Sequence, residues 1–208
     1  MIFPEDSKVE TLKNSCFYTA HVKKIKFPPS LKKLDEEWAV SLYDLVEIEI
    51  SPKNPFFIYY DNKYLLGKSA ESSGKFDVLY YARFDIDEAL MPPQVTIIKP
   101  HSFVGHKMLK CVTFPNNSQI KRIESFAFSA SSIKKLELPA SLEMIGDSCF
   151  SFASELTEIK VSPKNKVFKV FDEKCLLMMS QPGSGVFDVL FFGMRDIESV
   201  RIPSYIKI

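Results

Sequence analysis

A short pattern of apolar positions recurs along the chain. An apolar-x-x-apolar-x-apolar segment that ends at or near a proline occurs seven times: Val22–Pro28, Leu45–Pro52, Ile86–Pro92, Leu109–Pro115, Ile133–Pro139, Leu156–Pro163 and Ile197–Pro203. The last two apolar positions of each copy have the period of two that is typical of a β-strand, and proline ends the strand because it has no N–H to donate. Each copy therefore predicts one short strand. Met1–Pro4 resembles the tail of an eighth copy.

A second pattern follows most copies. It runs apolar-x-x-apolar and, five residues after the second apolar position, reaches a phenylalanine preceded by a small residue. The four instances are Leu12 to Phe17, Ile98 to Phe103, Ile123 to Phe128 and Ile145 to Phe150. Leu34 to Trp38–Ala39 keeps the spacing but exchanges the large and small positions. The pattern predicts a turn-rich return after each strand.

The chain also repeats over a longer distance. A shift of 111 positions places residues 1–97 on residues 112–208 without a gap, and roughly 32 of the 97 pairs are identical. Successive strand patterns start 23, 41, 23, 24, 23 and 41 residues apart, so each long period contains one enlarged unit. The enlarged units span about 51–91 and 162–202. We expect each to be a coil widened by two extra short strands around a polar loop, and the 183–185 loop tip to be its most mobile part.

One such unit cannot bury its own apolar residues, but stacked units can. The repeat therefore predicts a single, mainly β solenoid over residues 1–208, a curved right-handed stack of about eight coils. An all-β sandwich is the alternative, and the gapless internal match argues against it.

Composition limits the classes of function. Lys and Arg (27) nearly balance Asp and Glu (26), and this net charge of +1 gives no field that would attract nucleic acid. No apolar run approaches the length of a membrane span, and residues 1–6 lack the features of a signal peptide. Cys16, Cys111, Cys149 and Cys175 lie far apart, so we interpret them as free thiols.

The segments Ser141–Phe150 and Leu156–Val161 resemble the repeat of BspA-like leucine-rich-repeat proteins, whose pattern runs roughly P-x-S-L-x-x-I-G-x-x-A/C-F-x-x-C-x-x-L-x-x-I-x-I-P. The resemblance extends over nearly the whole chain, with Ala153 departing from the second cysteine position. It implies a leucine-rich-repeat array with short parallel strands that acts as a surface antigen, without enzymatic activity, in cell adhesion or other protein–protein interaction. It therefore implies a protein ligand and a location at the cell surface or outside the cell. The missing signal peptide and the unpaired cysteines leave an intracellular, cytoplasmic scaffold for protein partners as the alternative.

No familiar catalytic motif is present: the chain lacks G-x-S-x-G, P-loop, G-x-G-x-x-G and H-E-x-x-H sequences. His101, His106 and Cys111 are spaced by five residues each, but a solenoid does not make them converge, so we expect solvated histidines rather than a metal site. No cofactor is expected. Asp77 and Asp188 supply too few oxygens for calcium and are better explained as hydrogen-bonded turn partners. Cys16 and Cys149 occupy the small-residue position and are expected to pack in the core.

The predicted binding site is the outward face of the strands. In each pattern the x positions point away from the core, and in a solenoid they form one continuous surface on which partners commonly bind. The candidate residues are Lys23, Lys24, Lys26, Glu47, Glu49, Lys110, Lys134, Lys135, Glu137, Glu158 and Lys160. The alternative is that these charges only keep the sheet soluble. Asn116 begins an N-x-S sequon after a strand-ending proline and would be a glycosylation site if the chain were exported.

The second long period stops within a coil, at Ile206–Ile208. Solenoid ends normally need a polar cap. We therefore expect this C-terminal coil to be incomplete, and the chain to fray there or to self-associate through uncapped ends.

Overall fold

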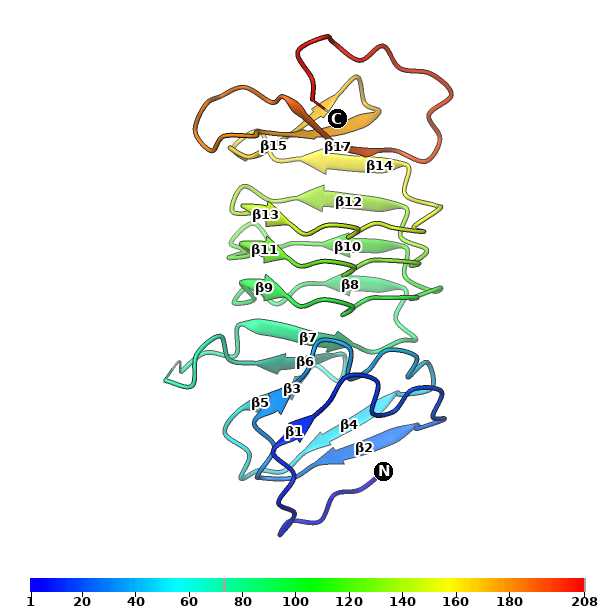
Figure 1. Cartoon of the computed structure of the whole chain (residues 1–208). Helices are drawn as coiled ribbons and strands as arrows, with labels where there is room; N and C mark the ends of the chain where they lie inside the picture. The colour runs from blue at the N-terminus through cyan, green and yellow to red at the C-terminus, as the bar shows by residue number, and fades with distance from the viewer. Residues whose placement is uncertain (73, 208) are drawn as a thin grey trace.

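The structure is a computed structural model that describes residues 1–72 and 74–207. Its strands form a β-solenoid of about seven coils that stack along one axis from the N-terminus to the C-terminus (Figure 1). The predicted solenoid is confirmed, with one coil fewer than the repeat suggested. Met1–Pro4 does not complete an eighth coil, because it contributes only an isolated parallel bridge between Ile2 and Lys26.

The first column of strands comes from the apolar-x-x-apolar-x-apolar pattern. Its strands are β2 (Lys24–Phe27), β4 (Glu47–Ile50), β8 (Glu88–Leu90), β10 (Cys111–Thr113), β12 (Lys135–Leu138) and β14 (Glu158–Val161). Within two groups, β2 with β4 and β8 with β10, β12 and β14, neighbours pair in parallel and keep equivalent residues side by side, as in Lys135 against Glu158 and Leu136 against Ile159. The seventh predicted strand, at Ile197–Pro203, is absent: the equivalent β8 pairs with the following coil, and the described residues offer no such partner here.

The second column follows the turn-rich pattern. Its strands, β1 (Thr11–Leu12), β3 (Lys33–Leu34), β9 (Ile97–Ile98), β11 (Arg122–Ile123) and β13 (Met144–Ile145), have two residues each and also run parallel. Short strands fit this column because the chain turns immediately afterwards toward the buried phenylalanine position.

Each enlarged unit forms a three-stranded antiparallel meander. The first contains β5 (Phe57–Tyr60), β6 (Tyr64–Gly67) and β7 (Val78–Ala82), and the second contains β15 (Phe168–Phe171), β16 (Cys175–Met178) and β17 (Val189–Gly193). Because β7 also pairs in parallel with β9, it occupies the second-column position of its coil. The other two strands of the first meander are the extra pair predicted from the sequence.

The first enlarged unit divides the core into two clusters. Along β6, Tyr64 and Leu66 belong to the C-terminal cluster, whereas Leu65 between them belongs to the N-terminal one. Successive side chains of a strand point to opposite faces, so β6 is covered from both sides. The C-terminal cluster contains stacked phenylalanine rings, with centroids 5.0 Å apart for Phe103 and Phe128.

Buried Asn54 connects one coil to the next. Its Nδ2 donates to the carbonyl oxygens of Pro28 and Leu31, and its Oδ1 accepts from the backbone N–H groups of Phe56 and Phe57. All the hydrogen-bonding capacity of the amide is thus used, as a buried polar side chain requires. Asn165 makes the equivalent four bonds in the second copy.

Candidate ligand-binding surface

The outward side chains of β2, β4, β8, β10, β12 and β14, with the residue before each strand, make up one surface that we call the strand face. The predicted candidates on it are at least partly exposed: Lys23, Lys24, Lys26, Glu47, Glu49, Lys110, Lys134, Lys135, Glu137, Glu158 and Lys160. The apolar residues that alternate with them, such as Ile25, Ile48 and Leu136, are buried. The alternation of inward and outward positions is therefore as the sequence predicted.

The strand face is not the single continuous sheet that the sequence suggested. β2 and β4 form one parallel sheet, and β8, β10, β12 and β14 form another. The first enlarged unit lies between β4 and β8 and prevents them from pairing (Figure 1). The outward charges are consequently divided into an N-terminal pair of strands and a C-terminal group of four.

Many of these charges pair with the neighbouring coil. Lys24 Nζ lies 2.8 Å from Glu47 Oε1 and 2.6 Å from Glu49 Oε1. Glu158 accepts from Lys135 at 2.8 Å and from Lys160 at 2.9 Å, and these two hydrogen bonds lower the pKa of its carboxyl group to about 2. Such ion pairs hold the charged side chains in fixed positions, and because opposite charges lie together they reduce the net electric field of the surface.

Three candidates remain without an ion pair to any described residue: Lys23, Lys110 and Glu137. Their charged groups are exposed, so a partner could meet them without first breaking a pair. The strand face thus combines fixed pairs with a few available charges.

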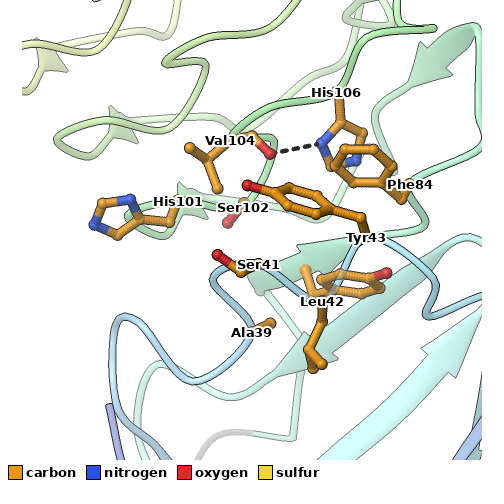
Figure 2. Close-up of a pocket in the computed structure, with 10 residues that line it drawn as sticks. Ala39, Ser41, Leu42, Tyr43, Phe84, His101, Ser102, Val104 and His106 are labelled. Carbon is orange, nitrogen blue, oxygen red and sulfur yellow. Dashed lines mark hydrogen bonds between the residues drawn. The ribbon is translucent and has the colours of Figure 1, made fainter. Parts of the chain in front are cut away.

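A small cavity lies where the turn after β3 meets the turn after β9. Figure 2 shows Ala39 to Tyr43 on one side, His101 to His106 on the other, and Phe84 beside them. The rings of Tyr43 and Phe84 have centroids 5.0 Å apart, and those of Phe84 and His106 are 4.7 Å apart. At about 10 Å³ the cavity has room for about one water molecule, so it is a packing defect rather than a ligand site.

The expectation of solvated histidines is wrong for His106. Its side chain is buried, with Nε2 3.2 Å from the carbonyl oxygen of Ala82, and burial lowers its pKa to about 4. His101 is partly covered and stacks on Phe126, with ring centroids 5.4 Å apart. Neither approaches Cys111 as a ligand, and within residues 1–72 and 74–207 no three His, Cys, Asp or Glu side chains gather as a metal site would require.

The two cysteines predicted to pack in the core behave differently. Cys149 is buried, which confirms the prediction, and burial raises the pKa of its thiol to about 12. The prediction is wrong for Cys16, which is exposed because no complete coil covers it on the N-terminal side. All four cysteines are free thiols, as predicted.

The turn role of the matched aspartates is confirmed. Asp77 accepts hydrogen bonds from the backbone N–H and the hydroxyl of Ser69, at 2.9 and 2.8 Å. Asp188 accepts the same two bonds from Ser180 and also pairs with Lys207 Nζ at 2.6 Å, contacts that lower its pKa well below the usual range. Each aspartate therefore ties the two ends of a meander loop together.

Two further features concern the surface of the chain. Asn116 lies in an exposed turn, where a sequon would be accessible, and its modification remains a prediction. The described residues contain no helix that is long and apolar enough to cross a membrane.

Sequence reasoning missed a groove of about 790 Å³ beside β14, where the strand face meets the second enlarged unit. Its lining includes Glu137 and Glu158 from the strand face and Val170, Glu173, Met194 and Asp196 from the enlarged unit. The signal was available in the long repeat, because Val170 and Met194 replace Tyr59 and Arg83 of the first copy.

Comparison with known proteins agrees with this architecture. Six copies of the BspA-type leucine-rich-repeat region match residues 1–60 and 77–178, which is more than half of the chain. The chain belongs to the BspA-type leucine-rich-repeat family. The comparison with curated protein sequences finds no match.

Three solved structures share the fold of this BspA-type chain. A leucine-rich-repeat protein from Eubacterium ventriosum aligns with a TM-score of 0.65 at 20% identity, covering 80% of this chain and 43% of that protein. The pneumococcal vaccine antigen PcpA aligns with a TM-score of 0.58 at 18% identity, covering 99% of this chain and 49% of the antigen. A leucine-rich cell surface protein from Faecalibacterium prausnitzii aligns with a TM-score of 0.58 at 16% identity, covering 99% and 57%. The BspA-type chain thus spans about half the length of these structures.

Proposed function

We propose that this BspA-type chain is a non-enzymatic adhesion module that works at the cell surface and binds a protein ligand on its strand face. The observation that carries this proposal is the regular presentation of outward side chains on six parallel strands, over a stack of buried residues. Solenoids use such surfaces because many coils can contact one partner at once. The surface location is supported by two structurally similar proteins, one described as a vaccine antigen and one as a cell surface protein.

The C-terminal part of the strand face is the better candidate for ligand contact. It holds four paired strands in one sheet, and Lys110 and Glu137 on it are free of ion pairs with described residues. Complementary charges on a partner would raise the association rate and confer specificity, and the binding should weaken as salt screens them.

Reversal of two adjacent charges tests this proposal. Lys134→Glu with Lys135→Glu places like charges beside Glu155 and Glu158, which the lysines now contact. We expect weaker binding to a panel of immobilised extracellular matrix proteins, with a circular dichroism spectrum like that of the unaltered chain. Lys32→Glu with Lys33→Glu is the matched control, because this adjacent pair contacts Glu10 and Asp35 on the second column.

Normal binding by the Lys134/Lys135 variant would contradict the assignment to the strand face. If substitutions in the loop at residues 67–75 abolished binding instead, the ligand site would lie on the enlarged unit. Residue 73 of that loop lies outside the described residues.

An intracellular scaffold is the second candidate, and the free cysteines favour it. Exposed Cys16 and partly exposed Cys111 carry thiols that a reducing compartment would preserve. Antibody staining separates the two functions: we expect staining of intact, unpermeabilised cells. Staining that appears only after permeabilisation would favour the scaffold.

A further inference from the structure

The groove beside β14 has an apolar floor and an acidic rim. Val161 and Val170, which are partly exposed, supply the apolar surface above the buried Ile159 and Met194. Glu137, Glu173 and Asp196 add carboxylates around it, and Lys160 adds one ammonium group. β14 is the last strand of its sheet, and Figure 1 shows it next to β15 and β17 of the second enlarged unit.

The equivalent positions of the first copy carry different side chains. Tyr59 and Arg83 stand there at the positions of Val170 and Met194. Arg83 Nη1 donates to the carbonyl oxygen of Asn62 at 3.0 Å, and Arg83 Nε pairs with Asp85 Oδ1 at 2.5 Å. The first copy thus has a phenol ring and a partly exposed guanidinium group where the second copy has the smaller Val170 and a methionine, Met194, that is buried in the core.

The replacement also leaves negative charge without a partner. Asp196 is the counterpart of Asp85, but Met194 cannot pair with it as Arg83 does. Glu173 replaces the neutral Asn62, and neither Glu173, Asp196 nor Glu137 forms an ion pair within the described part of the chain. Glu158 pairs with Lys135 and with Lys160, which also lines the groove, and this group carries a charge of +1. Together with Glu137, Glu173 and Asp196 the net charge around the groove is therefore −2, so it remains negative.

β14 adds a backbone edge to this surface. It pairs with β12 along one side, and on the other side it pairs with no strand in the described ranges 1–72 and 74–207. Such an edge presents N–H and C=O groups that an extended chain can pair with, while its side chains alternate between floor and rim.

We propose that this groove binds an extended, basic segment of a partner protein, which adds as a strand to β14. Its apolar side chains cover Val161 and Val170, and its lysine or arginine side chains meet Glu137, Glu173 and Asp196. The inference rests on the proposed function, because the groove continues the C-terminal part of the strand face, and it gives the partner a definite chemistry.

A synthetic peptide tests the proposal directly. The probe is a fluorescein-labelled peptide of about eight alternating lysine and valine residues, roughly the length of an ordinary strand. Its binding to the full chain is measured by fluorescence anisotropy. We expect saturable binding that weakens with salt, and no binding of the matching glutamate–valine peptide.

The internal repeat supplies the decisive variant. Val170→Tyr with Met194→Arg introduces the two residues of the first copy, and we expect it to weaken peptide binding by about tenfold or more. Met144→Arg introduces the same residue at an exposed position of β13 and should leave binding unchanged.

A second double variant is needed because Met194 is buried and its replacement could impair folding. Glu173→Lys with Asp196→Lys changes two exposed residues instead. It should lose the basic peptide and bind the acidic one.

Equal binding of the two peptides to the unaltered chain would overturn the proposal. So would undiminished binding of the basic peptide by either folded double variant, Val170→Tyr with Met194→Arg or Glu173→Lys with Asp196→Lys. If the peptide fails to bind while matrix proteins still bind and still respond to Lys134→Glu with Lys135→Glu, the groove assignment is wrong and the proposed function stands. If the peptide binds as expected but no matrix protein does, the proposed adhesion function is the part that fails.

Discussion

At the scale of single residues, the two buried asparagines show how one side chain can fix the junction of two coils. Asn54 and Asn165 each use both amide hydrogens and both lone pairs on backbone groups, in two copies related by the long repeat. Loss of such a side chain leaves several buried backbone groups without partners, each of which costs about 1 to 3 kcal/mol.

Asn54→Ala should therefore lower the free energy of unfolding by at least about 2 kcal/mol. Asn116→Ala, in an exposed turn, should change it by about 0.5 kcal/mol or less. Urea denaturation of both variants measures the difference. Equal stability of the two would mean that water satisfies the groups around Asn54.

His106 makes the stability depend on pH. Its pKa is about 4 in the folded chain, because burial disfavours the charged ring, against an ordinary value of 6.5. As the pH falls below 6.5 the unfolded chain takes up a proton that the folded chain does not accept until about pH 4. The stability that neutral His106 confers is thus complete above pH 6.5 and is lost across this window, to a total of about 3 kcal/mol.

His106→Phe should accordingly flatten the dependence of unfolding free energy on pH between 6.5 and 4. Urea denaturation of both proteins at several pH values in this window measures it, since contributions from other groups cancel in the difference. Parallel curves for the two proteins would show that His106 does not titrate differently in the folded and unfolded chains.

At the scale of elements, stability comes from contacts between coils. Phe128 is the middle ring of a stack, 5.0 Å from Phe103 and 6.2 Å from Phe150 between centroids. Phe17 is also buried, but it follows β1, which pairs with a strand on one side only. The same side chain therefore has a different environment in the middle of the array and near its end.

Phe128→Ala should lower the unfolding free energy by about 3 to 5 kcal/mol, as a truncation in a packed core does. Phe17→Ala should have a smaller effect, because the surroundings of an end coil relax more easily into the space. Denaturant unfolding of the two variants provides the comparison. Equal losses would indicate that the array has no protected middle.

At the scale of the whole molecule, the density of backbone pairing differs along the axis. Residues 109–161 contain five paired strands, β10 to β14, whereas residues 197–206 contain no strand and are mostly exposed or partly exposed. Local stability should follow this difference, because exposed, unpaired backbone opens most readily. The sequence-based expectation of fraying at the C-terminal coil agrees with it, although residue 208 lies outside the described residues.

Amide hydrogen exchange on a demonstrated monomer should show faster exchange at residues 197–206 than at 109–161. Equal protection in the two segments would contradict the expectation. Dimers detected by sedimentation would instead support self-association through this coil.

The sequence by itself determined the solenoid, the positions of six first-column strands and the outward direction of residues such as Lys135 and Glu158. These features follow from local periodicity, which repeats in every coil and therefore needs no knowledge of distant contacts. The roles of Asp77 and Asp188 were predictable for the same reason, since each one's serine partner is only eight residues away.

Only the tertiary structure decided what happens where the regular repeat is interrupted. The break between β4 and β8, the burial of His106 and the exposure of Cys16 each depend on which coil lies next to the residue, and equivalent sequence positions do not have equivalent neighbours. The groove beside β14 depends in the same way on Val170, which is smaller than its counterpart Tyr59, and on Met194, which is buried in the core whereas its counterpart Arg83 is partly exposed. A repeated pattern specifies the inside of each coil, but the contents of the space between unlike coils are set by packing in three dimensions.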